Sequence, residues 1–381
     1  MSGGFDMEQT FLTVINIEKV RHLKNVQIPL DKESRKHLIL TGKNGSGKTS
    51  VLDGLAYALQ KNAGRYFPDN ISQQNDDLKV RIYFPPGCSA YLSEKYVRGD
   101  ILIAYYKANR FTMVETSKSI EKVELCEQYK LHDSPGTKLV KYMVDLKATQ
   151  AFAQQKMDDT RASEIAEWFC RFEGILKKVF DDPSLKLDFD IDNFTFRIIQ
   201  ANREPFDFNT MSSGYSAVFH IINDLIMRME KHKTTDMEGI VLIDEIDTHL
   251  HLELQRTILP FLTELFPNIQ FIVTTHSPFV LNSIENAVIF DLETGTLVKD
   301  GLKNYPYDGI VESFFKTDQL SAELRNKLNR YKALAEKQDL SDRDMAEVME
   351  LESALDEIPD FLSPKIAEEY NRIRLELSNR G

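Results

Sequence analysis

The chain has 381 residues, a formal net charge of −12 at pH 7 and three cysteines. This length can hold one large α/β domain or two smaller ones, and the acidic balance disfavours a protein that coats nucleic acid with its whole surface. No apolar run approaches the ~18–20 residues of a membrane span, and the first ten residues lack a signal-peptide pattern. The odd number and wide spacing of the cysteines predict neither a disulfide framework nor a zinc site. We therefore expect a cytoplasmic protein without a membrane partner.

The N-terminal third is organised around the sequence GKNGSGKT at 42–49, which fits the phosphate-loop pattern G-x-x-x-x-G-K-[ST]. Residues 11–17 and 26–30 predict an antiparallel strand pair, 37–40 an apolar strand, and 50–60 a buried helix after the loop. In this context the glycines turn backbone N–H groups inward, and the helix start adds its positive dipole end. The predicted nucleotide contacts are Gly42, Lys43, Asn44, Gly45, Ser46, Gly47, Lys48, Thr49 and Ser50, with Lys48 on the β- and γ-phosphates and the Thr49 hydroxyl on Mg²⁺.

After this helix the pattern changes. Residues 78–84 alternate in polarity, 101–106 form a second apolar run, and 122–126 offer a third, so we expect a β-rich lobe inserted at about 65–145. A helical lobe should follow at about 146–235. It begins with a helix over 160–180 and a hairpin that joins 185–189 to 194–199.

Three further segments carry candidate chemistry, and each stands at the end or the start of an apolar element. Residues 211–216 (MSSGYS) precede an apolar helix, where small residues make an anion site. The apolar strand 240–243 ends in Asp244 and Glu245, which places both carboxylates at the ligand crevice of an open α/β sheet. There Asp244 would hold Mg²⁺ and Glu245 would orient or deprotonate water. A second strand, 271–273, leads to His276, a candidate contact for the γ-phosphate and the water. The alternatives are an ordinary polar strand end and a structural histidine.

The last segment, 296–381, predicts an appendage of three helices, 320–334, one capped by Ser341 with Asp344, and one that begins at Ser363-Pro364. Asp342 and Asp344 also have the D-x-D spacing of a TOPRIM metal site. No strand precedes them, so the cap is the favoured interpretation and we expect no nuclease of the chain's own.

Over residues 11–290 the order of these motifs resembles the ABC-type ATPase heads of the SMC, Rad50, RecF and OLD group. The resemblance implies an α/β head with a phosphate-loop sheet core, a β-rich lobe and a helical lobe, spanning 1–295, that binds ATP and Mg²⁺ as a head-to-tail dimer. It also implies that Ser212, Ser213 and Gly214 contact the γ-phosphate of the opposite subunit. Asp247 matches the D-loop aspartate, His276 the switch histidine, and Arg21 an early arginine near the nucleotide.

The sequence departs from that pattern at Ser213, where a second glycine is usual, and at Tyr215, where a glutamine or similar residue is usual. The glutamine loop has only Gln73 and Gln74 as candidates. The long heptad run and the C-x-x-C hook of SMC and Rad50 proteins are both missing from the sequence.

Within the group, the chain resembles the short stand-alone ATPases of bacterial anti-phage systems such as Septu, PARIS and certain retrons. This resemblance implies a slow ATPase, classed with AAA proteins, that controls a separate effector protein, a nuclease or a toxin, with indirect contact to nucleic acid. Two alternatives stay open at this point. One is a RecF-like repair ATPase that clamps DNA directly; the other, disfavoured by the long stretch between the phosphate loop and MSSGYS, is the nucleotide-binding subunit of a transporter.

Overall fold

The computed structural model describes residues 9–64, 78–109, 113–201, 203–305, 309, 322–337, 339, 341–356 and 364–378. Gln73 and Gln74 lie outside the described residues. The chain divides into two compact units, Met1–Ile310 and Val311–Gly381. None of the helices in the described ranges combines the length and the apolar character that a bilayer crossing requires.

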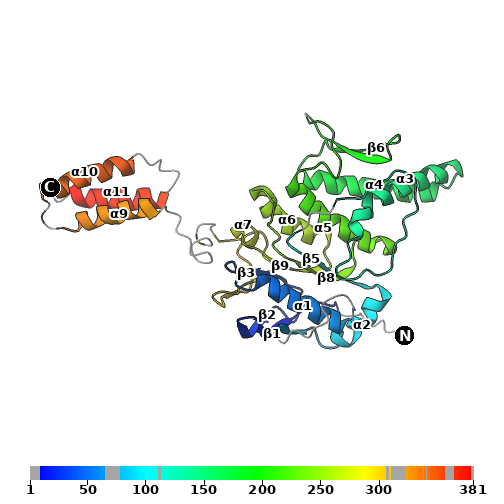
Figure 1. Ribbon diagram of the computed structural model, residues 1–381, viewed down its shortest axis with the longest axis horizontal. Coiled ribbons are helices and arrows are strands. Elements are labelled where there is room, and N and C mark those ends of the chain that lie inside the picture. The colour runs from blue at the N-terminus through cyan, green and yellow to red at the C-terminus, as the bar shows by residue number, and fades with distance from the viewer. Residues whose placement is uncertain are drawn as a thin grey trace. The chain divides into compact units, whose positions relative to one another are not determined.

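The first unit is built on a six-stranded sheet in the order β11-β10-β3-β9-β8-β5 (Figure 1). All neighbours pair in parallel except β11, which runs antiparallel to β10. Parallel strands covered on both faces are nearly continuous apolar runs, and every residue of β3, β5, β9 and β10 is buried. Because parallel strands end at the same edge, the residues that follow them converge there. The strands are β3 (His37–Thr41), β5 (Ile101–Tyr106), β8 (Glu238–Ile243), β9 (Ile269–Thr274), β10 (Ala287–Asp291) and β11 (Leu297–Val298).

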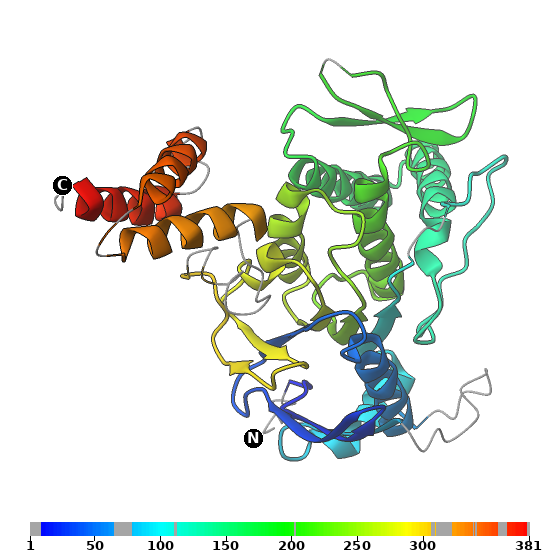
Figure 2. The same ribbon diagram turned by 60° about the vertical axis from the view of Figure 1, so that its left-hand side comes forward.

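A second, antiparallel sheet has the order β2-β1-β4, with β1 at Val14–Val20, β2 at Leu23–Pro29 and β4 at Leu78–Tyr83. Helix α1 (Lys48–Asn62) lies between the two sheets (Figures 1 and 2). Its apolar side chains join those of both sheets in one core cluster. This packing fixes the start of α1, and therefore the loop before it, against the central sheet.

The insertion 65–145 differs from the expected β-rich lobe. Strand β4 joins the small antiparallel sheet, whereas β5 is an edge strand of the central sheet, and 122–126 form no strand. The reason lies in the two patterns. The continuous apolar run of β5 suits a strand covered on both faces, and the alternating β4 suits a sheet with one exposed face.

On the side of the central sheet opposite α1, α5 and α6 lie next to the sheet, and α3 and α4 lie farther from it (Figure 1). The predicted helix at 160–180 is present as α4, where Trp168 stacks on Phe172 with ring centroids 5.4 Å apart. The predicted hairpin is formed by β6 and β7. The elements of this region and its flanks are α2 (Cys88–Arg98), η1 (Pro135–Lys138), α3 (Leu139–Gln155), α4 (Asp159–Val179), β6 (Lys186–Asp190), β7 (Thr195–Ile199), α5 (Ser213–Met229), η2 (Glu230–His232), α6 (Leu252–Leu265) and α7 (Pro278–Leu281).

The second unit contains helices α9 (Ala322–Ala335), α10 (Asp342–Asp356) and α11 (Pro364–Ser378), which share an apolar core around Tyr331 and Tyr370. The predicted cap is confirmed: the Ser341 backbone N–H donates to Asp344 Oδ2 (3.1 Å), and the Asp344 N–H donates to Ser341 Oγ (3.2 Å). The Asp344 carboxylate of the D-x-D sequence is therefore part of a helix start.

Candidate nucleotide site

The loop that joins β3 to α1 has the backbone form that a phosphate loop requires. Gly42, Gly45 and Gly47 have φ angles of 134°, 85° and 98°. Residues with a Cβ atom rarely adopt such positive φ angles. Lys48 is buried, and its Nζ donates to the carbonyl oxygens of Gly42 (2.8 Å) and Lys43 (3.2 Å). The ammonium is thus held over the concave side of the loop. Burial lowers the pKa of Lys48, and the carboxylates of Glu245 and Asp244 oppose that shift.

The centre of the site is a hydrogen-bonded chain that joins the start of α1 to the ends of β8 and β9. Thr49 Oγ1 at the start of α1 donates to Asp244 Oδ2 (2.9 Å), and Thr274 Oγ1 at the end of β9 donates to Asp244 Oδ1 (2.7 Å). The same Thr274 hydroxyl accepts from the Glu245 backbone N–H (2.7 Å). One threonine of the neighbouring strand therefore binds the Asp244 carboxylate and the Glu245 backbone, while the Glu245 carboxylate accepts from Thr248 Oγ1 (3.1 Å).

The next threonine repeats this arrangement. Thr275 Oγ1 donates to Asp247 Oδ1 (2.5 Å) and accepts from the Ser277 N–H (2.9 Å). The Ser277 hydroxyl donates to Gln255 Oε1 (2.6 Å) and accepts from the Phe279 N–H, so it caps α7. As a result the turn after β8 and the turn after β9 are linked at two consecutive points.

His276 stands between these links, half-buried beside Lys48. Burial and the positive charge of Lys48 lower its pKa, and the nearby carboxylates only partly counter them, so the imidazole is neutral at pH 7. Within the described residues, His276 Nε2 and Ser46 Oγ are buried and have no hydrogen-bond partner. A ligand rich in oxygen atoms that occupied the loop would supply partners for both.

The side chains also fit a magnesium ion. Thr49 Oγ1 and Asp244 Oδ2 are neighbouring oxygen atoms at the rim of the phosphate loop, and Mg²⁺ prefers oxygen ligands. Three or more His, Cys, Asp or Glu side chains do not converge anywhere in the described ranges.

Arg21 lies in the turn between β1 and β2, with an exposed side chain and a φ of 52°. This turn reaches the phosphate loop, because a Cβ atom on Gly47 would lie 3.3 Å from Leu23 Cδ1 and 3.8 Å from His22 Cε1. The structure therefore brings the Arg21 turn beside the loop, and a contact of Arg21 with nucleotide stays a prediction.

Ser212 is the N-cap residue of α5, and its side chain makes no capping bond to the helix. Ser212 and Ser213 are exposed, whereas Gly214 is buried, and a Cβ on Gly214 would lie 3.0 Å from the His249 carbonyl oxygen. In the part of the chain that the structure describes, no hydrogen bond joins these residues to the phosphate loop. Tyr215 packs its ring on Phe180, with centroids 4.2 Å apart. The start of α5 thus presents two hydroxyls outward and is anchored by its neighbours.

Three residues of this site were not predicted from the sequence: Thr274, Thr275 and Asp291. Asp291 ends β10 and lies close to the loop, since a Cβ on Gly42 would be 3.2 Å from its Oδ1. The signal was available for each of them, because all three are polar residues at the end of an apolar strand.

A family model described as "AAA domain, putative AbiEii toxin, Type IV TA system" matches residues 153–282. The Septu protein PtuA of Bacillus thuringiensis is 35% identical over 279 residues, which cover 64% of this chain and 67% of that protein. The chain belongs to the PtuA family. The predicted resemblance to Septu proteins is therefore confirmed.

The PtuA of Bacillus mycoides (strain KBAB4) is 26% identical over 380 residues, covering 91% of this chain and 51% of that protein. The chain thus spans about half the length of this relative within the PtuA family. Among solved structures, an SMC head bound to the C-winged helix domain of ScpA aligns with a TM-score of 0.41 at 15% identity, over 77% of this chain and 98% of that one.

Proposed function

We propose that the chain binds ATP with Mg²⁺ in the loop between β3 and α1 and hydrolyses it slowly. The observation that carries this proposal is the chain of hydrogen bonds from Thr49 through Asp244 to Thr274 and the Glu245 N–H. It joins Thr49 to the Asp244 carboxylate across 195 residues of sequence and continues through Thr274 to the Glu245 backbone. A structural strand end would not need a carboxylate that is bonded both to the threonine after the phosphate loop and to the neighbouring strand.

Each side chain has a distinct part in the reaction. Lys48 neutralises phosphate charge at the loop, and the Thr49 hydroxyl and the Asp244 carboxylate would hold Mg²⁺, which supplies electrostatic stabilisation of the phosphoryl group. Glu245 takes a proton from the attacking water as the water oxygen bonds to the γ-phosphorus and the bond from that phosphorus to the bridging oxygen breaks. ADP and phosphate are the products. Neutral His276 hydrogen-bonds the water or the γ-phosphate through Nε2.

The proposal includes a head-to-tail dimer in which Ser212, Ser213 and Gly214 of one subunit approach the nucleotide of the other. Support comes from the two exposed hydroxyls at the start of α5, which is an anion-attracting helix end. The γ-phosphate would then be bound by both subunits, and hydrolysis would remove the bridge. Following its family, the dimer would control a separate effector, a nuclease or a toxin, in anti-phage defence.

Nucleotide binding and hydrolysis are tested by two variants. Lys48→Ala should abolish ATP binding in calorimetry, because the loop loses the buried ammonium group that would neutralise the phosphate charge. Glu245→Gln should keep ATP affinity within about threefold and lower the hydrolysis rate by 10²-fold or more, on the order of a general-base contribution. Unchanged ATP affinity in Lys48→Ala would contradict the assignment of the phosphate loop.

The dimer is tested by light scattering on Glu245→Gln with ATP and Mg²⁺. We expect the mass of a dimer with ATP and of a monomer without it. Ser212→Arg in the same background should restore the monomer while each subunit still binds ATP. A monomer in Glu245→Gln at saturating ATP would reject the head-to-tail arrangement and leave the binding site itself standing.

A further inference from the structure

Helix α5 contains a buried ion pair about three turns after its start. Arg228 Nε donates to Asp224 Oδ2 (2.7 Å), and both side chains are buried. Two donors from the insertion also bind the carboxylate: the Tyr106 hydroxyl at the end of β5 donates to Oδ2 (2.7 Å), and the Gly136 N–H in η1 donates to Oδ1 (3.1 Å). The pair therefore ties α5 to an edge strand of the central sheet and to η1.

The same pair also holds the loop before η1. Arg228 donates to the carbonyl oxygens of Lys130 (3.0 Å) and Asp133. A Cβ atom on Gly136 would lie 2.5 Å from the Asp224 backbone nitrogen, so the backbones of η1 and α5 are in direct contact here. Burying two charges costs free energy that their attraction often only recovers, and an apolar pair of similar volume is frequently as stable. The pair therefore points to a role in fixing the place of α5 rather than to a gain in stability.

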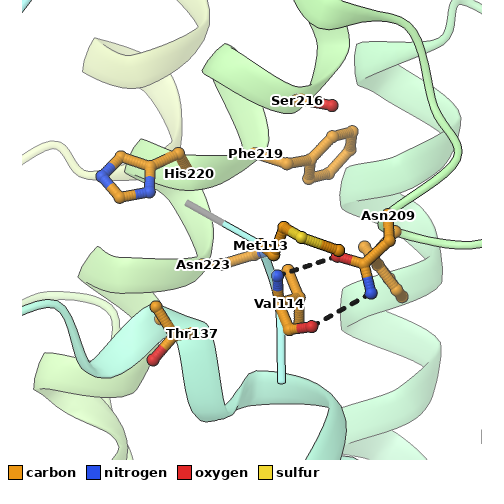
Figure 3. A pocket seen from close by; sticks show the side chains of 10 residues that line it. Met113, Val114, Thr137, Asn209, Ser216, Phe219, His220 and Asn223 are labelled. Atoms are coloured by element: carbon orange, nitrogen blue, oxygen red, sulfur yellow. Dashed lines mark hydrogen bonds between the residues drawn. The ribbon is translucent and has the colours of Figure 1, made fainter. Parts of the chain in front are cut away.

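The first half of α5 has more open surroundings than this contact. A cavity of about 140 Å³ lies beside it, and its other walls include the segments at 113–114, 136–137 and 208–209 (Figure 3). The α5 side chains that line the cavity are those of Ser216, Phe219, His220 and Asn223. Asp224 is therefore the point at which α5 is held closely to the insertion, and the direction of the helix relative to β5 depends on the bonds there.

The other end of this network reaches the nucleotide site. Tyr106 is the last residue of β5, and its carbonyl oxygen accepts from the Asp244 backbone N–H (2.8 Å). One residue thus bonds to Asp244 through its backbone and to Asp224 through its ring. The Asp244 carboxylate in turn accepts from Thr49 after the phosphate loop, and α5 begins at the segment 212–214. A continuous series of hydrogen bonds therefore joins the phosphate loop to the helix that presents this segment.

We propose that Tyr106, Asp224 and Arg228 are positioning residues that set the start of α5 according to whether nucleotide occupies the phosphate loop of the same subunit. They act through Asp244 at one end of the network and through the segment 212–214 at the other. Nucleotide that fixes Asp244 fixes the end of β5, and the buried bonds carry this constraint to the helix. The inference rests on the proposed nucleotide site, and it does not require the dimer.

The test measures backbone amide exchange in the first turns of α5, at residues 216–222, by mass spectrometry. The parent is the full chain with Ser212→Arg and Glu245→Gln, which should stay monomeric and keep its ATP. We expect saturating ATP with Mg²⁺ to slow exchange there by about threefold or more, because the helix start becomes more firmly held. Adding Tyr106→Phe removes one hydroxyl and should reduce this effect to less than about 1.5-fold, with ATP affinity within about twofold of the parent.

Tyr142→Phe is the matched control. The Tyr142 hydroxyl donates to Glu230 Oε1 at 2.7 Å, so this change also removes one tyrosine–carboxylate bond of the same length, between α3 and the residue that follows α5. A general loss of stability would affect both variants alike. Because the bond at Tyr142 does not involve β5, the control should keep the full ATP-dependent change in exchange.

Three outcomes would overturn the proposal: an ATP-dependent change that survives in Tyr106→Phe, one that is lost equally in Tyr142→Phe, or none in the parent chain although calorimetry shows bound ATP. Calorimetry on the same parent sample separates this failure from that of the proposed function. If the parent binds no ATP at all, the nucleotide site itself is rejected and the inference with it.

Discussion

At the scale of single residues, Thr274 binds both acidic residues that follow β8, Asp244 through its carboxylate and Glu245 through its backbone. Its hydroxyl donates to Asp244 Oδ1 and accepts from the Glu245 N–H, and the residue is fully buried at the end of β9. Hydrogen bonds to charged groups contribute about 1.5–3 kcal/mol each. Thr274 is thus a positioning residue that acts through Asp244 and Glu245 rather than on the substrate.

Thr274→Val keeps the shape of the side chain and removes the hydroxyl. We expect the ATP hydrolysis rate at saturation to fall by about 10- to 100-fold while ATP affinity changes by less than about threefold, because the phosphate loop is untouched. Thr274→Ser, which restores the hydroxyl, is the matched control and should recover most of the rate. A valine variant with wild-type turnover would show that the two acidic residues are positioned by other contacts.

His37 makes the stability of the fold depend on pH. It is buried at the start of β3, its Nδ1 accepts from the Phe271 N–H (3.1 Å), and burial with the nearby charges of Arg35 and Lys36 lowers its pKa to about 4. Above pH 6.5 the imidazole is neutral in both the folded and the unfolded chain. As the pH falls toward 4, only the unfolded chain takes up the proton, so the folded state loses stability.

The free energy of unfolding should therefore drop by up to about 3 kcal/mol between pH 6.5 and pH 4 from this residue alone. His37→Asn keeps an acceptor near the Phe271 N–H and cannot be protonated, so its unfolding in urea should depend less steeply on pH over that interval. Parallel pH profiles for the two proteins would mean that His37 is solvated or already protonated in the fold.

At the scale of elements, the first turn of α5 is packed against the turn that follows β8. Gly214 allows this approach, because a Cβ there would lie 3.0 Å from the His249 carbonyl oxygen and 3.5 Å from Leu254 Cδ1. Backbone cannot move aside as a side-chain end can. A methyl group at this position would separate the helix start from the turn that carries Asp247.

We predict that Gly214→Ala lowers the free energy of unfolding by about 1–3 kcal/mol, the usual cost of overpacking. The control is Gly174→Ala in α4, where no atom lies within 4 Å of the added Cβ. That change should raise stability by about 0.5–1 kcal/mol, because alanine is the better helix former. Chemical denaturation measures the free energy of unfolding of both variants. If both substitutions change it in the same direction, the close contact at Gly214 is contradicted.

Much of the fold could be predicted at this scale because the decisive patterns are local. The strand before the phosphate loop, helix α4, the β6–β7 hairpin and the Ser341 cap each follow from the spacing of apolar residues or from cap chemistry. The place of β5 could not be predicted, because an apolar strand shows that it is covered on both faces without showing which neighbour it pairs with.

At the scale of the whole molecule, every candidate nucleotide residue lies in the unit Met1–Ile310, while Val311–Gly381 has an apolar core of its own. A chain ending at residue 310 should therefore bind ATP with an affinity within about threefold of the full chain, as calorimetry would show. The segment 311–381 should give a helical circular dichroism spectrum by itself. Loss of ATP binding on truncation would show that the second unit supports the site.

The candidate site could be predicted in part because strand ends in a parallel sheet converge on one edge. This rule predicts Asp244, Glu245 and His276 near Lys48, and the structure brings them together. Thr274 and Thr275 were missed because a hydroxyl shows its role only once its partner is known. Whether Ser212 to Gly214 reach a nucleotide is a property of two chains and stays a prediction.

The backbone of Glu245 has a φ of 47°, in the left-handed region that non-glycine residues enter at a cost of about 1–2 kcal/mol. The position proposed for the base is consequently one where the folded state would gain from glycine or asparagine. Selection of a variant library for heat resistance alone should therefore enrich glycine and asparagine at position 245. The selected variants should also lose ATP hydrolysis, because they lack the proposed base. Selection for thermal stability and selection for ATP hydrolysis would therefore favour different residues at position 245.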